Sequence, residues 1–103
     1  MKKQTIKILG CQYDLSVVAG LAEKEELCGQ IDYDNQLIRI AEDVGEHVKS
    51  VAVMHEVLHG IWKSLGEDKL RQNERVVDAL ANALVQVLRE NPTVVDMVRG
   101  VWK

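Results

Sequence analysis

The 103-residue sequence contains no Phe and only one Pro, and its aromatic residues are limited to two Trp and two Tyr. Aliphatic side chains, Val above all, must therefore fill its core. It has two Cys, Cys11 and Cys28, which could form at most one disulfide. So few cysteines exclude the dense disulfide framework of small secreted domains. We expect both residues to be free, buried thiols in a reducing compartment.

An excess of positive charge is also absent, since 16 Asp and Glu outnumber 13 Lys and Arg for a formal net charge of -3. Such a chain has no field that would attract phosphate backbones or anionic lipids. No apolar run approaches the ~18 residues of a membrane span. Lys7, Gln12 and Asp14 interrupt the apolar stretch that a signal peptide would require. The sequence thus predicts a cytoplasmic protein without nucleic-acid or membrane partners, and it leaves the oligomeric state open.

Length and composition predict a single domain that spans residues 1–103. Chains of roughly 100–150 residues are the commonest domain size, and contents of 47% hydrophobic and 28% charged residues are typical of globular proteins. Apolar and polar residues alternate over about the first forty positions, whereas the remainder repeats at helical spacing. This division predicts an α+β fold.

Local patterns predict the elements of this fold. Alternation favours strands, turn residues mark their ends, and apolar positions three or four apart favour helices. In chain order the sequence predicts two short strands on either side of Gly10, a β-hairpin over residues 29–41 with its turn at Asp34 and Asn35, a helix from about Glu46 to Gly66, a long helix that begins between Asp68 and Asn73, and a short helix from Pro92.

Residues 55–59 read His-Glu-Val-Leu-His, the H-E-x-x-H pattern of zinc peptidases. Residues four apart on a helix are offset by only ~40° and one turn of rise, so His55 and His59 can bind one metal ion. Glu56 is rotated by ~100° from His55, which places its carboxylate beside the metal as a general base. An accidental match has odds on the order of one in a hundred in a chain of this composition. Two ordinary helix histidines therefore remain the alternative unless a further motif supports the metal site.

A second motif begins fourteen positions after His59, where residues 73–78 read Asn-Glu-Arg-Val-Val-Asp. With it the sequence resembles the gluzincins, the thermolysin-like zinc peptidases, whose third metal ligand is a Glu in an Asn-Glu-x-x-x-Asp string. The resemblance implies that Glu74 is this ligand and that Asp78 orients the first histidine. Four residues apart, the two carboxylates share a helix face, and an Asp that accepts a hydrogen bond from the Nδ1–H of a ligating His fixes its tautomer. Because Asp78 has apolar neighbours, we expect it to lean toward the core.

The whole chain is similar in plan to the minigluzincins, which are single-domain gluzincins of about this length, and to small phage or mobile-element metallopeptidases. The resemblance implies a zincin-like domain in which a small N-terminal sheet packs on the active-site helix. The glutamate helix and a short C-terminal helix follow on the other side of that helix. Residues 29–90 carry most of this similarity. Unlike larger gluzincins, the sequence has no obvious equivalent of the Tyr or His that stabilises the oxyanion.

These motifs together predict a zinc-dependent metallopeptidase. The resemblance implies that His55, His59 and Glu74 hold Zn²⁺ while Glu56 takes a proton from the attacking water and a peptide or protein substrate is hydrolysed. We expect the strand near residues 36–41 to form the upper rim of the cleft, where an extended peptide could pair with its exposed edge. Two alternatives remain, namely a catalytically silent zinc-binding module with a regulatory or interaction role, and a helical structural domain without metal.

The third ligand could instead be His47 or Asp68. In that case Glu74 and Asp78 would belong to a solvated acidic face, which is a common feature of helices. His47 lies eight residues before the first motif histidine, close to the expected helix start. An exposed position is therefore the more typical interpretation of this residue.

Three aromatic residues lie near the expected site. Trp62 is seven residues from His55 on the same helix face, so we expect it to form the floor beneath the metal. Tyr13 and Tyr33 could donate a hydrogen bond to an oxyanion. Packing on the core is nevertheless the commoner role of a tyrosine on a half-buried strand.

Overall fold

The computed structural model describes residues 4–102, which form a four-stranded mixed sheet and five helices. This architecture confirms the predicted α+β class. In chain order the elements are β1 (Gln4–Ile8), β2 (Cys11–Val18), α1 (Leu21–Glu25), β3 (Gly29–Asp32), β4 (Leu37–Ala41), α2 (Glu46–Leu65), α3 (Asp68–Arg71), α4 (Glu74–Glu90) and α5 (Pro92–Val98).

The turn after β1 reverses the chain within two residues. Leu9 and Gly10 have φ angles of 48° and 85°, and positive φ at both central positions is typical of a type I′ hairpin turn. β1 and β2 pair antiparallel on either side of this turn, with Ile8 opposite Cys11. The hairpin confirms the two strands predicted around Gly10.

The predicted hairpin over residues 29–41 is present as β3 and β4. The Asp32 carboxylate accepts the backbone N–H of Asn35 at 3.1 Å and its side-chain N–H at 2.9 Å, which stabilises the turn. β4 pairs antiparallel with β3 and parallel with β2, so the sheet order is β1-β2-β4-β3. The prediction that the strand before the active-site helix exposes an edge is therefore wrong. β4 is paired on both sides, and β3 is the edge strand.

The local sequence pattern does not predict α1, although its first residue is part of the core. Leu21 is only 1% exposed. The Asp43 carboxylate accepts the backbone N–H groups of Ala22 and Glu23 at 3.1 and 3.0 Å, and thereby satisfies donors that every helix start leaves unpaired. Asp43 lies 20 and 21 positions further along the chain, so no local pattern could reveal this cap.

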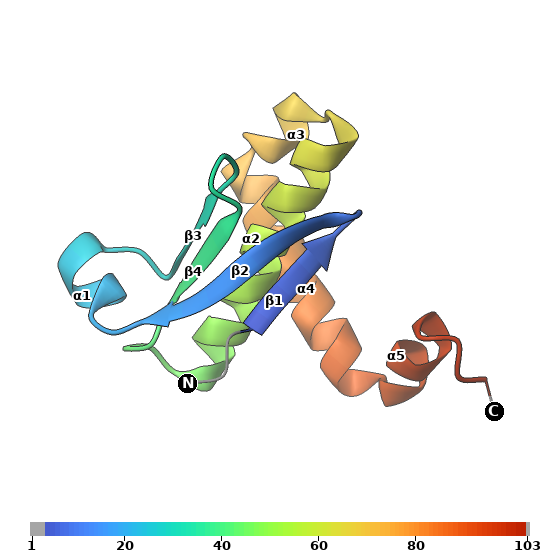
Figure 1. The fold of residues 1–103 in the computed structure, drawn as a ribbon. Coiled ribbons are helices and arrows are strands. Elements are labelled where there is room, and N and C mark those ends of the chain that lie inside the picture. Colours follow the sequence, from blue (N-terminus) through green and yellow to red (C-terminus); the bar gives the residue numbers. More distant parts are fainter. Residues whose placement is uncertain (1–3, 103) are drawn as a thin grey trace.

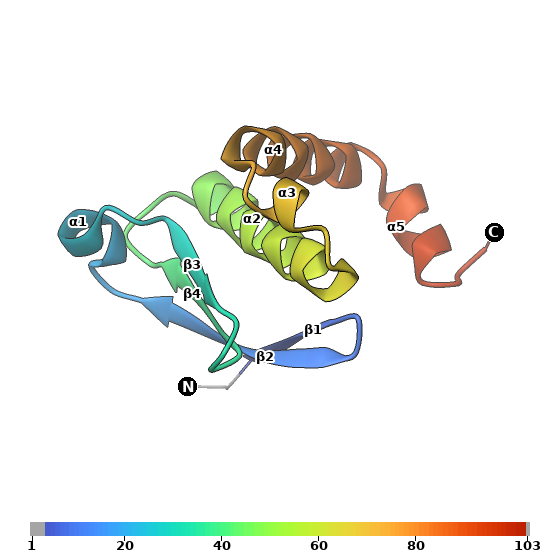
Figure 2. The same cartoon turned by 90° about the horizontal axis from the view of Figure 1, so that it is seen from above.

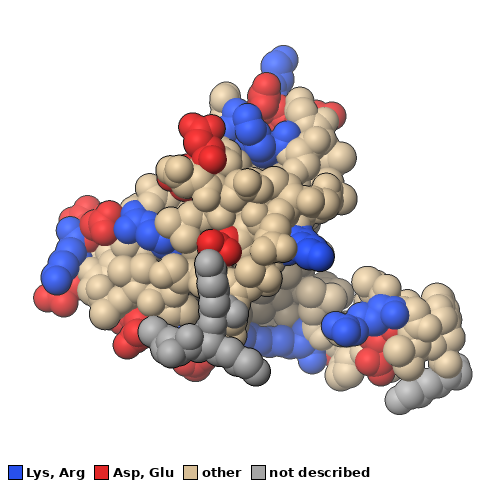
Figure 3. All heavy atoms as spheres, in the orientation of Figure 1, with Lys and Arg blue, Asp and Glu red and all other residues tan. Residues whose placement is uncertain are grey.

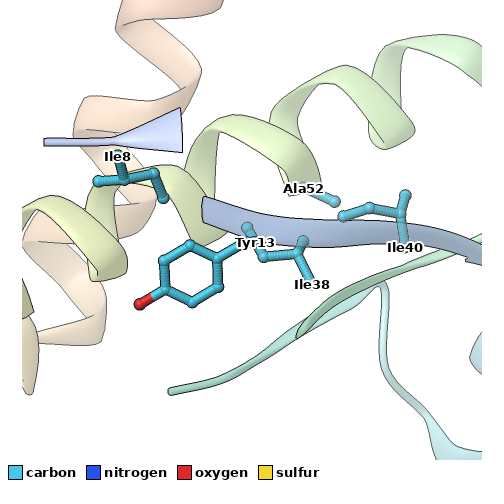
Figure 4. Packing of buried hydrophobic residues seen from close by; sticks show 5 residues of the cluster. All are labelled: Ile8, Tyr13, Ile38, Ile40 and Ala52. Atoms are coloured by element: carbon cyan, nitrogen blue, oxygen red, sulfur yellow. The ribbon is translucent and has the colours of Figure 1, made fainter. Parts of the chain in front are cut away.

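α2 lies between the sheet and α4 (Figure 2). Its sheet side has an aliphatic core in which isoleucine, rather than the expected valine, dominates. Gly60 allows close packing there, because a Cβ at this position would lie 2.6 Å from Cδ1 of Ile8. The buried cluster on the sheet side, drawn in Figure 4, comprises Ile8, Tyr13, Ile38, Ile40 and Ala52. The buried cluster between α2 and α4 comprises Leu58, Val77 and Ala81.

The last two helices begin where the sequence predicts. The Asn73 side chain accepts the backbone N–H of Val76 at 3.2 Å and caps α4, and Pro92 opens α5. α5 extends away from the end of α4 (Figure 1), and none of its residues is buried. The expectation that the C-terminal helix packs on α2 beside the glutamate helix is therefore wrong. Val94 and Val98 of this helix remain exposed, Val95 and Met97 are half-buried, and Trp102 beyond it is 73% exposed.

The surface carries charges of both signs. Acidic and basic side chains are interspersed on the face shown in Figure 3, and neither sign dominates it. Among the helices of residues 4–102, none has the length and apolar character needed to cross a membrane.

Candidate metal centre

Two helices bring the predicted ligands together. His55, Glu56 and His59 lie in the middle of α2, and Glu74 is the first residue of α4. The buried cluster of Leu58, Val77 and Ala81 holds the two helices against each other. The side-chain cap at Asn73 fixes the point at which α4 begins, and thus the position of Glu74.

The three predicted ligands converge within hydrogen-bonding distance of one another. Nε2 of His55 is 3.1 Å from Nε2 of His59. The two oxygens of Glu74 lie 3.0 Å from these two nitrogens, Oε2 from that of His55 and Oε1 from that of His59. Ligands of a tetrahedral zinc ion lie roughly 3.3–3.6 Å apart, given metal–ligand distances of about 2.0–2.2 Å. The cluster therefore fits a single zinc ion after a shift of a few tenths of an ångström.

Both histidine rings also contact an acceptor outside the cluster of three ligands. Nδ1 of His55 lies 3.7 Å from Oδ1 of Asp78, and the backbone of Arg71 hydrogen-bonds the ring of His59. When the proton of each ring lies on Nδ1, which is the tautomer that a metal bound at Nε2 requires, the lone pairs of both Nε2 atoms face Glu74. Two lone pairs and a carboxylate that face one point repel each other unless a cation or proton lies between them. Burial also lowers the pKa of His59, against the opposing effect of Glu74, and so favours the neutral imidazole that a metal binds.

Glu56 lies beside this cluster but is not part of it. Its side chain is buried, with only 6% of the residue exposed. Burial raises the pKa of Glu56 to about 7; the nearby His55 opposes this shift and Glu74 adds to it. The carboxyl group can therefore exchange a proton near neutral pH, which is the property required of a general base.

Gly29 on β3 makes room for the Glu56 carboxylate. A Cβ at this position would lie 3.1 Å from Oε2 of Glu56 and 3.2 Å from Cδ1 of Ile40. Sequence reasoning did not identify Gly29 as part of the site, since it lies on a strand 27 positions before Glu56. Nor did it identify the Arg71 backbone contact to His59. In both cases the signal is a tertiary contact that no local motif contains.

Two cavities meet at the cluster. One, of about 400 Å³, extends toward the start of α2, past Cys28, His47 and Asp78. The other, of about 560 Å³, extends past His59 toward Tyr33 and Arg71. His55, Glu56 and Glu74 line both, as does Gly29 on the sheet edge. The cluster thus lies along a continuous groove between β3 and the two helices.

Asp78 lies near His55 as predicted, but its surroundings differ from the prediction. Its side chain is 66% exposed and lines the smaller cavity, so it does not lean toward the core. The apolar neighbours Val77 and Leu80 pack against α2 in its place. The distance of 3.7 Å to Nδ1 of His55 permits an electrostatic interaction but exceeds that of a hydrogen bond.

The alternative third ligands lie elsewhere. His47 is exposed, and its Nδ1 lies 2.7 Å from Nη1 of Arg89. Asp68 binds Arg71 at 3.3 Å. Within the described residues, the group of side chains that could hold a metal comprises His55, His59 and Glu74.

Of the aromatic residues considered for the site, Tyr33 lies in it, whereas Trp62 and Tyr13 do not. Trp62 packs into the cluster between α2 and α4 and lines neither cavity, so the prediction that it forms the floor of the site is wrong. Tyr13 is 3% exposed in the core, whereas Tyr33 lines the larger cavity. Cys11 and Cys28 are free thiols, as expected, but Cys28 is exposed and Cys11 is only partly buried, so the prediction that both are buried is wrong.

Comparison of this chain with protein-family models, with curated proteins and with solved structures found no match.

Proposed function

We propose that this protein is a zinc-dependent metallopeptidase. The convergence of two imidazole nitrogens and a carboxylate within 3.1 Å, next to a buried carboxyl group, is the observation that carries this proposal. His₂Glu is the ligand set of catalytic zinc in several peptidases. The gluzincin and minigluzincin resemblance of the two sequence motifs points to the same function, and a zincin-like fold is part of this proposal.

His55, His59 and Glu74 would hold the metal. Zinc bound by such a set lowers the pKa of a bound water toward ~7 and polarises a carbonyl oxygen. Asp78 and the backbone of Arg71 would keep the two rings in the orientation that presents Nε2.

Glu56 would act as the general base. Burial raises its pKa, which favours acceptance of a proton from the attacking water, and the same carboxyl group would return this proton to the leaving amine. Burial of this side chain keeps bulk water from competing for the proton. Gly29 maintains the space that the carboxylate needs.

The groove suits an extended peptide. β3 is an edge strand, and its residues Gly29 to Ile31 line the larger cavity next to Glu56. A peptide that adds to a sheet edge gains main-chain hydrogen bonds, while its alternate side chains enter pockets. The scissile carbonyl would then lie over the metal cluster. The edge at β3 takes the role that the sequence pattern assigns to β4.

The test is hydrolysis of a tryptic digest of casein by the zinc-loaded protein, with new termini detected by mass spectrometry. We expect Glu56→Gln to reduce cleavage by roughly 10²–10⁴-fold, the usual contribution of a general base, while its zinc content stays at the parent level. Glu67→Gln, an exposed position on the connection after α2, is the matched control and should cleave like the parent. A zinc-loaded parent that cleaves no faster than Glu56→Gln would instead support the silent zinc-binding module.

A further inference from the structure

The larger cavity contains two residues that the proposed chemistry does not use. Beyond His59 and Glu74 it is lined by Tyr33, in the turn after β3, and by Arg71, at the end of α3. An arginine and a tyrosine therefore line the groove immediately next to the metal cluster. Both groups can donate hydrogen bonds to an anion.

Arg71 is held firmly but retains free hydrogen-bonding capacity. Its backbone contacts the ring of His59, which fixes the residue beside the metal centre. Nη2 lies 3.3 Å from Oδ1 of Asp68, whereas Nε is shielded from solvent without a partner. A guanidinium group has five N–H donors in a fork that matches a carboxylate. The Asp68 carboxylate and the Tyr33 phenol oxygen accept from this group, which leaves further N–H donors of the fork for a ligand.

Tyr33 positions this guanidinium group. The Arg71 guanidinium carbon lies 5.5 Å from the centre of the Tyr33 ring, and Nζ of Lys63 lies 5.6 Å from the same ring. Both distances are within the range of a cation–π interaction. The tyrosine therefore holds the Arg71 guanidinium group beside it in the lining of the cavity, and Lys63 contacts the same ring.

The charges that line this cavity are complementary to an anion once the metal is in place. Its carboxylates, Glu56 and Glu74, belong to the metal centre, where a divalent cation would offset them. The Arg71 side chain is the charged group of the lining that has no role in that centre, where only the Arg71 backbone takes part. A carboxylate offers this group two charged acceptor oxygens in matching geometry, whereas a neutral carbonyl offers a single uncharged one, and charge-assisted hydrogen bonds are the stronger kind.

We propose that Arg71 and Tyr33 form a subsite for a carboxylate group of the substrate, either an Asp or Glu side chain or the free C-terminus of a peptide. This inference rests on the proposed function, because the subsite adjoins the metal cluster. It predicts a preference for acidic peptides or for peptide ends. Arg71 acts in specificity and takes no part in proton transfer.

The test uses four peptide hydroxamates, which bind through a metal-chelating group and differ only at the last residue. This residue is Glu or Gln, each with a free C-terminal carboxylate or a C-terminal amide. Zinc content is measured on every sample first, and calorimetry then gives the dissociation constants. We expect the Glu acid, and whichever of the Glu amide and the Gln acid carries the recognised carboxylate, to bind the parent roughly tenfold more tightly than the neutral Gln amide. The comparison of the Glu amide with the Gln acid identifies the source of the carboxylate.

Arg71→Gln should abolish this preference without loss of zinc. Arg75→Gln is the matched control, since Arg75 is exposed on α4 and does not line this cavity, and it should keep the preference. Arg71→Lys, which keeps the charge but lacks the fork, should keep part of it. A preference that survives in Arg71→Gln overturns the subsite, as does a zinc-loaded parent that binds all four peptides alike or none. A parent without zinc overturns the proposed function itself, and the subsite with it.

Discussion

Glu56 differs from its neighbours on α2 because it is charged and yet buried. Transfer of a carboxylate out of water disfavours its ionised form, and the pKa of about 7 follows mainly from this burial. Burial of this carboxyl group therefore lowers the free energy of unfolding at neutral pH. Such a cost is typical of functional sites, where the chemistry needs a group that packing alone would not select.

This cost predicts how stability depends on pH in the metal-free protein. Below pH 4.5, the ordinary pKa of Glu56, the group is protonated in both the folded and the unfolded state. As the pH rises to about 7, only the unfolded chain releases the proton, so the parent loses stability. Glu56→Gln lacks this titration. We expect the variant to be more stable than the parent by roughly 1–3 kcal/mol at pH 8 and equally stable near pH 4.

Urea unfolding at several pH values, with zinc removed by a chelator, measures this difference. Glu67→Gln removes the same charge from an exposed position, so its stability should follow that of the parent at every pH. A constant offset between Glu56→Gln and the parent from pH 4 to pH 8 would contradict the assignment of the shift to Glu56.

Asp78 should influence the metal indirectly. Removal of a group that orients a ligating histidine typically weakens metal binding by 10–100-fold. Asp78 is 66% exposed and lies 3.7 Å from Nδ1 of His55. We therefore expect Asp78→Ala to weaken zinc binding by roughly tenfold, at the lower end of this range. Competition titration with a chromophoric zinc chelator measures the affinity, with Asp34→Ala in the distant hairpin turn as the control. A loss as large as that of His55→Ala would make Asp78 a ligand.

At this scale, the part of the site that could be predicted from the sequence is the part encoded by helical spacing. His55 and His59 are four apart, and the N-cap at Asn73 marks where Glu74 begins the next helix. Gly29 and Arg71 could not be predicted, because their roles arise from contacts with residues remote in the chain. The solvent exposure of Asp78 could not be predicted from the sequence either, because it depends on how α4 is rotated against α2.

Among the elements, α4 determines whether the third ligand can reach the two histidines. It begins at Glu74, so the stability of its first turn governs the position of this carboxylate. Helix ends fray unless their backbone donors find partners. Here the Asn73 side chain provides one, at 3.2 Å from the backbone nitrogen of Val76.

We therefore expect Asn73→Ala to lower the free energy of unfolding by roughly 0.5–2 kcal/mol and to weaken zinc binding as well. Asn73→Ser replaces the cap with another good one and should restore both properties. Urea unfolding and zinc titration of the two variants check this. Equal behaviour of the Ala and Ser variants would show that the cap does not position Glu74.

The strands and α1 show why local sequence patterns do not suffice to predict the arrangement of the sheet. The prediction for β3 and β4 was correct because the turn and the alternation of the hairpin are local. The parallel pairing of β2 with β4 joins strands that are separated by α1 and β3, and only this pairing moves the sheet edge to β3. Similarly, α1 depends on the cap from Asp43.

At the scale of the whole molecule, the groove is assembled from three separate parts of the chain. These are the edge strand β3, the centre of α2, and the segment from the end of α3 into α4. The sheet and α4 pack on opposite sides of α2 (Figure 2), which brings the three parts to one cleft. A metal bound there by residues of α2 and α4 would connect the two helices and stabilise the folded state.

The most direct test of this account is the zinc content of the purified protein by elemental analysis, combined with zinc titration of Glu74→Ala. We predict one zinc per chain in the parent and a strong loss of affinity in the variant, because a three-ligand site needs its carboxylate. Glu67→Ala and Asp68→Ala should bind like the parent. A parent that holds no zinc, or a Glu74→Ala variant that binds it as tightly as the parent, would contradict the metal centre described above.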